Sequence, residues 1–307
     1  MPGKHATRVF DLVVNYHSGD SFSNSLTPPN SLDRSTLATV GNEISIDYTI
    51  PAKICRVNSD GTSYFSVASI LALLDDFSSY GLLMQDRNHR PGVSVKLNTE
   101  ILRPCKAGEK VRLVSRSDKI GKSMAFCSME VRSTSGEVLA RGKHLKFVQM
   151  GFFWDLLTSA LLFPLVLMIL EYMISNKAKK TSKKAEEDAA PIVVGQMFDD
   201  LNLLEVKDPS NLFNSKLQST TTTDNNNQKK KEKKNSFIYD PAEKYFTLKV
   251  NKSLSNVLGA MHGGAVAAAA EEACVQLAAS AKSSAASRGS IHAMEVTYLS
   301  PTKVSLY

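Results

Sequence analysis

The feature that most constrains the fold is an internal repeat, because it divides the chain into two related units. Gly92 and Pro104 recur as Gly289 and Pro301, both 197 residues further on. The strand-like segments that end at the two prolines align without a gap, and each follows a long apolar stretch with the length of a helix. A repeat of this kind predicts two copies of one folding unit.

The first copy predicts an α+β unit. Residues 44–50 alternate apolar and polar side chains, as a strand does, and residues 66–84 form a helix with Ser66 as its N-cap. Four further alternating runs, separated by turn residues, follow at 93–102, 110–117, 124–132 and 138–148. This order predicts a long helix packed on a curved antiparallel sheet.

The second copy repeats only part of this layout. A strand at 245–250, a helix at 263–281 and a strand at 291–299 follow one another in the same order. About two strands of the first copy have no counterpart before the last residue. We therefore expect a second unit that is truncated at its C-terminus.

Composition divides the chain into five parts. They are an N-terminal extension at 1–40, the first unit at 41–149, an apolar helix at 150–175, a lysine-rich low-complexity linker at 176–236 and the second unit at 237–307. The linker is rich in Lys, Ser, Thr, Asn and Gln, so we expect it to be disordered, with a docking helix over its apolar residues at 192–194 and 197–204 as the alternative.

The apolar segment predicts contact with a membrane. Residues 156–170 are apolar except for two hydroxyl side chains, and as a helix they span about 22 Å, less than the ~30 Å core of a bilayer. Pro164 would kink such a helix. We favour a membrane-associated segment at 151–174, with a buried interdomain helix and a true single span as the alternatives. The lysines after it suit an anionic membrane face.

The net charge of +7 comes from clusters of lysine rather than from a basic surface. Two clusters lie at 177–184 and 229–234. Such runs are typical of solvated linkers, with lipid or nucleic-acid contact as the alternative. Since no basic region is interleaved with aromatic residues, we expect no nucleic-acid partner.

Cysteine usage predicts a reducing, intracellular compartment. The four cysteines have no C-x-x-C spacing and show no metal-ligand pattern: Cys55, Cys105, Cys127 and Cys274. The N-terminus lacks the apolar core of a secretory signal, whereas a location in mitochondria or another organelle stays open. We expect no metal and no cofactor.

One motif in the second copy carries the chemistry. It reads N-x-x-G-x-x-H-G-G from Asn256 to Gly264 and opens the predicted helix. The N–H groups at a helix start lack partners and carry positive partial charge, which suits a carbonyl oxygen that gains negative charge when a thioester is attacked. Glu271 or Glu272, further along the same helix, places a carboxylate where a base or nucleophile could act.

With this motif and the strand at 294–301, the chain resembles the hotdog-fold acyl-CoA thioesterases of the PaaI-like group. The first copy resembles the same family at Leu73-Leu74-Asp75 and at 91–95. The resemblance covers 44–148 and 240–307. It implies two hotdog folds, each a long helix wrapped by an antiparallel sheet, and active sites at the interface of a dimer of hotdogs.

The resemblance assigns the second copy to the half-site that holds the thioester carbonyl. Asn256, His262 and Gly263 match that half, and Gly264 completes the motif. The place of the family's acid falls on Glu271 by spacing from the histidine, or on Glu272 by alignment from the downstream proline. The family's serine falls on Ile291, so this copy lacks the other half-site.

In the first copy the matches are reversed. Asp75 matches the family's acid and Ser94 its serine, whereas Ser66 and Asp60 stand where the family has histidine and asparagine. If the two copies pair within the chain as a pseudo-dimer, only one composite site is complete. We therefore predict one working site per chain.

The family resemblance implies a role for each residue of that site. Gly263 N–H and the Asn256 amide would polarise the thioester carbonyl, and Asp75 would activate water or attack directly. Ser94 would orient the water or hold the carboxylate. His262 would orient Asn256 or stabilise the departing thiolate.

These residues predict an acyl-CoA thioesterase that releases a free fatty acid and coenzyme A. The alternative is a non-catalytic acyl-CoA-binding protein or membrane scaffold that keeps the hotdog pair for binding. A hotdog hydratase would need a different Asp and His arrangement, which the sequence lacks. Acyl-chain length, the CoA-contacting residues and further homo-oligomer formation stay open.

Overall fold

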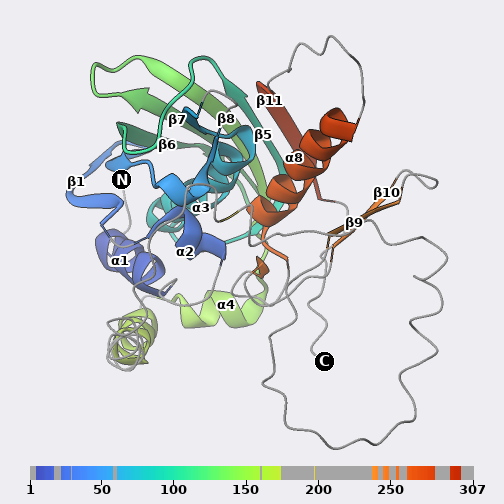
Figure 1. The fold of residues 1–307 in the computed structure, drawn as a ribbon. Helices are drawn as coiled ribbons and strands as arrows, with labels where there is room; N and C mark the ends of the chain where they lie inside the picture. Colours follow the sequence, from blue (N-terminus) through green and yellow to red (C-terminus); the bar gives the residue numbers. More distant parts are fainter. Residues whose placement is uncertain are drawn as a thin grey trace, which may run out of the picture.

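The computed structural model describes residues 5–16, 22–28, 30–57, 61–159, 161–173, 197, 237–240, 245–248, 254–255, 261–280 and 291–298. Within these ranges the chain forms a seven-stranded antiparallel sheet in the order β1-β2-β6-β7-β8-β5-β11. Helix α3 packs on the sheet, and α8 lies against α3 (Figure 1). A sheet around one long helix agrees with the predicted α+β unit and with a hotdog fold.

The sheet strands are β1 Leu32–Val40, β2 Glu43–Thr49, β5 Val93–Ile101, β6 Lys110–Ile120, β7 Met124–Ser133, β8 Val138–Phe147 and β11 Ala293–Thr297. Two smaller pairs are β3 Cys55–Val57 with β4 Ser63–Phe65, and β9 Phe237–Asp240 with β10 Tyr245–Leu248. The helices are α1 Ala6–Tyr16, α2 Phe22–Leu26, η1 Ala52–Ile54, α3 Val67–Gln85, α4 Phe152–Leu157, Phe163–Met173 and α8 Gly263–Ser280.

Helix α3 is the buried centre of the fold. Ser66 caps it by accepting the Ser69 N–H at 3.2 Å, as predicted for an N-cap. Nearly all of its side chains are buried, because the sheet covers one side and α1, α2 and α8 cover others. Gly142 on β8 permits this close packing, since a Cβ there would lie 2.1 Å from Leu74 Cδ1. Because Leu74 packs closely on β8, the neighbouring side chain of Asp75 is held inside the fold.

The second part of the chain joins the first through β5 and α3. Strand β11 pairs antiparallel with β5, with Glu295 opposite Asn98 and with Thr297 opposite Lys96. Asn98 and Glu295 are also the positions that the 197-residue repeat makes equivalent. The strand pairing is therefore symmetric about these two residues, as at a two-fold axis.

The sheet extends further toward the N-terminus than the predicted boundary at residue 40. Strand β1 forms an edge of the sheet beside β2, and α1 and α2 pack against α3. The alternation of β1 is hard to recognise because its register shifts between Asp33 and Ala38. Residues in the predicted extension therefore contribute to the core.

The predicted single apolar helix at 150–175 is wrong, because this segment forms two short helices, α4 and Phe163–Met173. The chain turns at Thr158 and Ser159, and Pro164 lies in the first turn of the second helix, where its missing N–H breaks no helical bond. Among the described residues, only α3 has the length and apolar character to cross a bilayer, and most of it is buried within the fold.

Several predictions fall outside the described residues. Apart from Met197, the linker at 176–236 is not described, and neither are Asp60, Asn256 and the residues after Tyr298. The disorder of the linker and the truncation of the second unit therefore stay predictions.

Candidate active site

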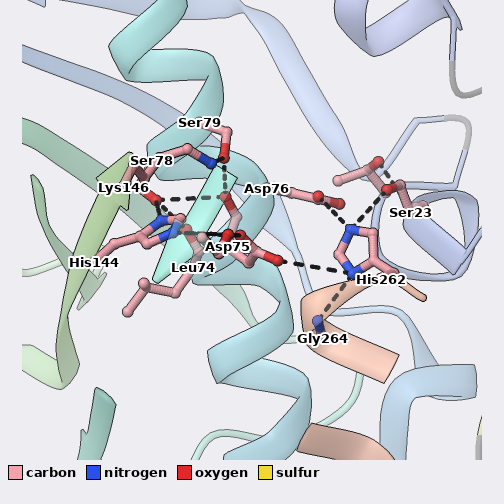
Figure 2. Close-up of polar contacts among 12 residues, drawn as sticks. Ser23, Leu74, Asp75, Asp76, Ser78, Ser79, His144, Lys146, His262 and Gly264 are labelled. Atoms are coloured by element: carbon pink, nitrogen blue, oxygen red, sulfur yellow. Dashed lines mark hydrogen bonds and ion pairs between the residues drawn. The ribbon is translucent and has the colours of Figure 1, made fainter. Parts of the chain in front are cut away.

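Three elements bring together most of the residues predicted for the composite site. Asp75 lies in the middle of α3, Ser94 on β5, and His262 and Gly263 at the start of α8. Ser94 Oγ donates a hydrogen bond to Asp75 Oδ1 at 2.8 Å, and His262 Nδ1 lies 3.9 Å from Asp75 Oδ2 (Figure 2). Asp75 and His262 are both buried. Asn256, the fifth predicted residue, lies outside the described residues.

A chain of polar side chains holds one oxygen of Asp75. His144 Nε2 lies 3.0 Å from Ser94 Oγ, and His144 Nδ1 lies 2.6 Å from Ser78 Oγ. Burial, with help from a nearby lysine, lowers the pKa of His144 to about 3, so the ring is neutral. We assign the ring proton to Nε2, because Ser94 can then donate its own proton to the carboxylate.

A buried lysine lies behind the carboxylate. Lys146 Nζ donates to Ser79 Oγ at 2.8 Å, and Ser79 Oγ donates to the backbone carbonyl of Asp75 at 2.5 Å. Burial lowers the pKa of Lys146, and Asp75 acts against this shift. Sequence reasoning missed Lys146 and His144. The sequence signal for these two residues is a pair of polar side chains at the positions of β8 that face inward, on the same side of the strand as Gly142.

The other oxygen of Asp75 faces the start of α8. A Cβ on Gly263 would lie 2.5 Å from Asp75 Oδ2 and 2.7 Å from the hydroxyl oxygen of Tyr298, so only glycine fits there. That hydroxyl is buried, and it has no hydrogen-bond partner among the described residues. Burial and then Asp75 raise the pKa of Tyr298. Glycine thus lets Asp75 Oδ2 and the Tyr298 hydroxyl come closer to the start of α8 than any side chain would allow.

Tyr298 was not predicted as a site residue, because its sequence context is that of an ordinary strand. Its backbone N–H donates to the Val95 carbonyl at 2.9 Å, which fixes it beside β5. Only the pairing of β11 with β5 carries its hydroxyl to Asp75. The contact depends on segments far apart in the chain, so no local pattern reveals it.

His262 is clamped by its own helix start and by a second acid. Gly264 N–H donates to Nδ1 at 2.9 Å, and Nε2 lies 2.8 Å from Asp76 Oδ1 and 3.3 Å from Ser23 Oγ. Burial disfavours the charged ring, but Asp76 and then Asp75 outweigh it and raise the pKa of His262. Since Nδ1 accepts a hydrogen bond, we assign the ring proton to Nε2, which donates to Asp76.

Glu271 and Glu272 lie away from Asp75, in a cluster at the start of α3. Glu271 Oε2 accepts the Ala68 N–H at 3.2 Å. Arg56 Nη2 lies 2.8 Å from Glu272 Oε2, and Arg56 Nε lies 3.6 Å from Glu271 Oε1. Burial raises the pKa of Glu271, and Arg56 acts against this shift. The two acids thus form ion pairs with an arginine that sequence reasoning missed.

Gly264 serves the packing of the two long helices. A Cβ on Gly264 would lie 2.4 Å from the Cβ of Ala72, so the glycine lets α8 approach α3 closely. In the part of the chain that is described, no group of three or more His, Cys, Asp or Glu side chains is arranged to hold a metal ion.

Comparison with known proteins finds a family model that matches the first part of the chain. Residues 53–148 match the family model described as Acyl-CoA thioesterase C-terminal domain. Acyl-coenzyme A thioesterase 13 of Mus musculus is 36% identical over 75 residues, which are 24% of this chain and 53% of that protein. The Homo sapiens protein of the same name is 33% identical over 92 residues, 30% of this chain and 64% of that protein. The chain thus spans less than two thirds of the length of these relatives.

Two solved structures are similar to this chain at lower identity. Thioesterase superfamily member 2 from Mus musculus is 25% identical with a TM-score of 0.36, covering 45% of this chain and 95% of that chain. The PaaI protein of E. coli is 13% identical with a TM-score of 0.34, covering 46% and 97%. The family model over residues 53–148 and the curated relatives thus support the resemblance of this chain to the hotdog-fold acyl-CoA thioesterases.

Proposed function

We propose that this chain hydrolyses acyl-CoA thioesters to a free fatty acid and coenzyme A at one composite site. The observation that carries the proposal is the approach of Asp75 on α3 to Gly263 and His262 on α8. A carboxylate beside a helix start supplies both a base for water and a donor for an oxyanion, which are the two needs of thioester hydrolysis. The names of the curated relatives support acyl-CoA as the substrate class.

In the first step, a water molecule bound to Asp75 Oδ2 at the start of α8 is the nucleophile. The same water would also serve the Tyr298 hydroxyl, which is buried and has no hydrogen-bond partner among the described residues. Asp75 takes a proton from the water while the water oxygen bonds to the thioester carbonyl carbon. The π electrons of the carbonyl move onto its oxygen, which becomes an oxyanion.

Donors at the start of α8 stabilise this oxyanion. Gly263 is the first residue of α8, so its N–H has no partner within the helix. The Asn256 amide is the second donor that the family resemblance implies. One preorganised donor is typically worth about 100- to 1000-fold in rate.

In the second step, the oxyanion re-forms the carbonyl π bond and the tetrahedral intermediate breaks its carbon–sulfur bond. The electron pair of that bond stays on the sulfur of coenzyme A, and the proton held by Asp75 passes to the thiolate. The products are a fatty acid and coenzyme A, and Asp75 returns to its starting state. No cofactor takes part in this scheme, since coenzyme A belongs to the substrate.

The other residues position the reacting groups. Ser94, held by His144, fixes one oxygen of Asp75 so that the second faces the water. His262 keeps its ring between Asp76 and the Gly264 N–H, and thus sets the direction of the N–H groups of α8. In this scheme His262 is a positioning residue rather than an acid.

The other helix start supports one working site per chain. At α3, the Glu271 carboxylate accepts the Ala68 N–H, so this donor is engaged and does not face a substrate. The symmetric pairing of β5 with β11 about Asn98 and Glu295 supports the view that the two parts are copies of one unit, paired as a pseudo-dimer. An intracellular location and further homo-oligomer formation belong to the same proposal.

The test is the release of the coenzyme A thiol from medium- and long-chain acyl-CoA by the full chain. We expect hydrolysis by the wild type, its loss in Asp75→Asn, and its retention in Glu272→Gln, which changes one of the two acids near the other helix start. Circular dichroism checks that each variant is folded. If the wild type binds acyl-CoA without cleaving it, the proposal fails and the non-catalytic binding function takes its place.

A further inference from the structure

We propose that α4 and the helix Phe163–Met173 form a surface that lies in the plane of a lipid membrane. Between residues 152 and 173, six large apolar side chains are more than half exposed to solvent. We call them the apolar face: Phe152, Phe153, Leu161, Met168, Tyr172 and Met173. Single exposed apolar residues are common on soluble proteins, whereas a concentration of them in one short segment marks an interaction site.

The periodicity of the second helix separates an outward from an inward side. Leu165, Met168 and Tyr172 follow one another at intervals of three or four residues, the spacing of one helical face, and all three are exposed. Phe163 and Leu167 are buried instead and pack with residues of α1 and α3. The helix is thus apolar on its outward side as well as on its inward side, unlike a helix that faces water.

The second helix is fixed on the rest of the fold, so its exposure does not come from a detached segment. Arg8 on α1 makes two hydrogen bonds of 2.8 Å to the carboxylate of Glu171. The ring of Phe163 stacks on His89 with 4.5 Å between the ring centres. These contacts hold the inward side and turn the apolar face toward the surroundings.

Helix α4 is fixed on the fold as well. The indole N–H of Trp154 donates to the Asn88 carbonyl at 3.1 Å. Phe152 and Phe153, next to Trp154 in the sequence, are more than three-quarters exposed. Aromatic side chains in such a position are typical of segments at the boundary between water and lipid.

The fold is incompatible with a membrane crossing by this segment. The proposed position is therefore along the membrane surface. Helix α8 and β11 follow the segment in sequence and pack against α3 and β5, which precede it, so both parts are on one side. The two helices have 6 and 11 residues, about 9 and 16 Å, against a bilayer core of ~30 Å. An in-plane segment satisfies both observations.

The charges in and after this segment favour a lipid surface, rather than a second copy of the chain, as the partner of the apolar face. Residues 152–173 contain two acids, and one of them, Glu171, is paired with Arg8. Five lysines follow within eleven residues of Met173: Lys177, Lys179, Lys180, Lys183 and Lys184. An apolar face next to a cluster of lysines is complementary to anionic headgroups above an acyl-chain region. Self-association would instead bring two lysine clusters toward each other.

The experiment is flotation of the full chain with phosphatidylcholine vesicles, with and without phosphatidylserine. We expect binding to both, stronger with phosphatidylserine, and loss of the difference at high salt. Phe152→Ser combined with Phe153→Ser should weaken binding at least tenfold, because each ring that leaves the lipid loses its apolar transfer free energy. Val40→Ser is the matched control, since Val40 on β1 is also exposed, and it should bind as the wild type does.

Two outcomes would overturn the proposal. One is vesicle binding by the double variant equal to that of the wild type. The other is a wild type that does not bind vesicles and sediments as a dimer, while the double variant sediments as a monomer. That result would make the apolar face a contact between two copies of the chain. Equal binding to both vesicle types would refute the part assigned to the lysines.

The orientation has its own measurement, because Trp154 is the single tryptophan of the chain. In-plane binding should shift its emission to the blue and allow quenching by lipids brominated near the headgroup. Quenching mainly by lipids brominated at the chain end would show deep insertion and overturn the in-plane arrangement.

Discussion

The starts of α8 and α3 are two versions of one arrangement, in which each helix start faces a carboxylate on the other helix. At α8, the absence of a side chain on Gly263 lets Asp75 Oδ2 approach the helix start. At α3, Glu271 accepts the Ala68 N–H directly, and Arg56 compensates its charge. The comparison teaches that one methylene and one arginine separate the candidate site from a helix start that is engaged in an ion pair.

The largest effect should come from removing the acid at the start of α8. Asp75→Asn should lower kcat for acyl-CoA about 1000-fold, because an amide cannot take the proton of the attacking water. Steady-state thiol release measures kcat. Glu272→Gln is the comparison variant and should stay within about twofold of the wild type. Similar losses in both variants would mean that the two helix starts are not different in function.

The next effect should come from adding a side chain at the start of α8. Gly263→Ala places a methyl 2.5 Å from Asp75 Oδ2 and should lower kcat about 100-fold, since Asp75 and the Gly263 N–H must move apart. At the other helix start, Ala68→Gly should cost about 1 kcal/mol of unfolding free energy and leave kcat unchanged. An active Gly263→Ala variant would show that the close approach of Asp75 to Gly263 is not needed.

Tyr298 sharpens the comparison further, because its hydroxyl borders only the candidate site. Tyr298→Phe should lower kcat about tenfold with KM unchanged, and it should not destabilise the fold, because the lost hydroxyl has no partner within the described residues. Tyr48→Phe is the control: its hydroxyl donates to the Leu26 carbonyl at 2.5 Å. That variant should lose about 1 kcal/mol of stability and keep its kcat. The reverse pattern would remove Tyr298 from the site.

The smallest expected effect is a pH dependence of stability from His144. A histidine of the unfolded chain titrates near pH 6.5, whereas burial lowers the pKa of His144 to about 3 in the folded protein. Between these values the unfolded chain binds a proton that the folded chain does not. Stability should therefore fall as the pH is lowered through this window, by up to about 1.4 kcal/mol per pH unit.

Urea unfolding between about pH 7 and pH 5 measures this slope. His144→Gln should make the slope shallower by about 1 kcal/mol per pH unit. His262, whose pKa is raised, contributes in the opposite direction and is present in both proteins. A slope that is the same in the variant would mean that His144 titrates normally in the folded protein.

Much of the fold was predictable from local patterns. The helix predicted at 66–84 is α3, and the alternating runs after it are the strands that surround it. The repeat aligned the two segments that pair as β5 and β11. Strand β1 was not predicted because its alternation breaks at a register shift, and the apolar helix at 150–175 was overextended because Pro164 starts a second helix.

The candidate site was predictable only in part. The glycine motif and the family resemblance indicated Asp75, Ser94, His262 and Gly263, and the fold brings these four residues together. Four neighbours were missed: Asp76, His144, Lys146 and Tyr298. They contact the site through strand pairing and helix packing between distant segments, which no local pattern encodes.

The pairing of β11 with β5 has a consequence for how the protein could be divided. Because sheet and helix contacts join the two parts, a backbone cut between residues 174 and 236 would leave two peptides with complementary faces. The linker then keeps the two peptides at a high effective concentration, and its Met197 packs in the core. A cleaved preparation should therefore lose activity on dilution and regain it on concentration, as a split enzyme does.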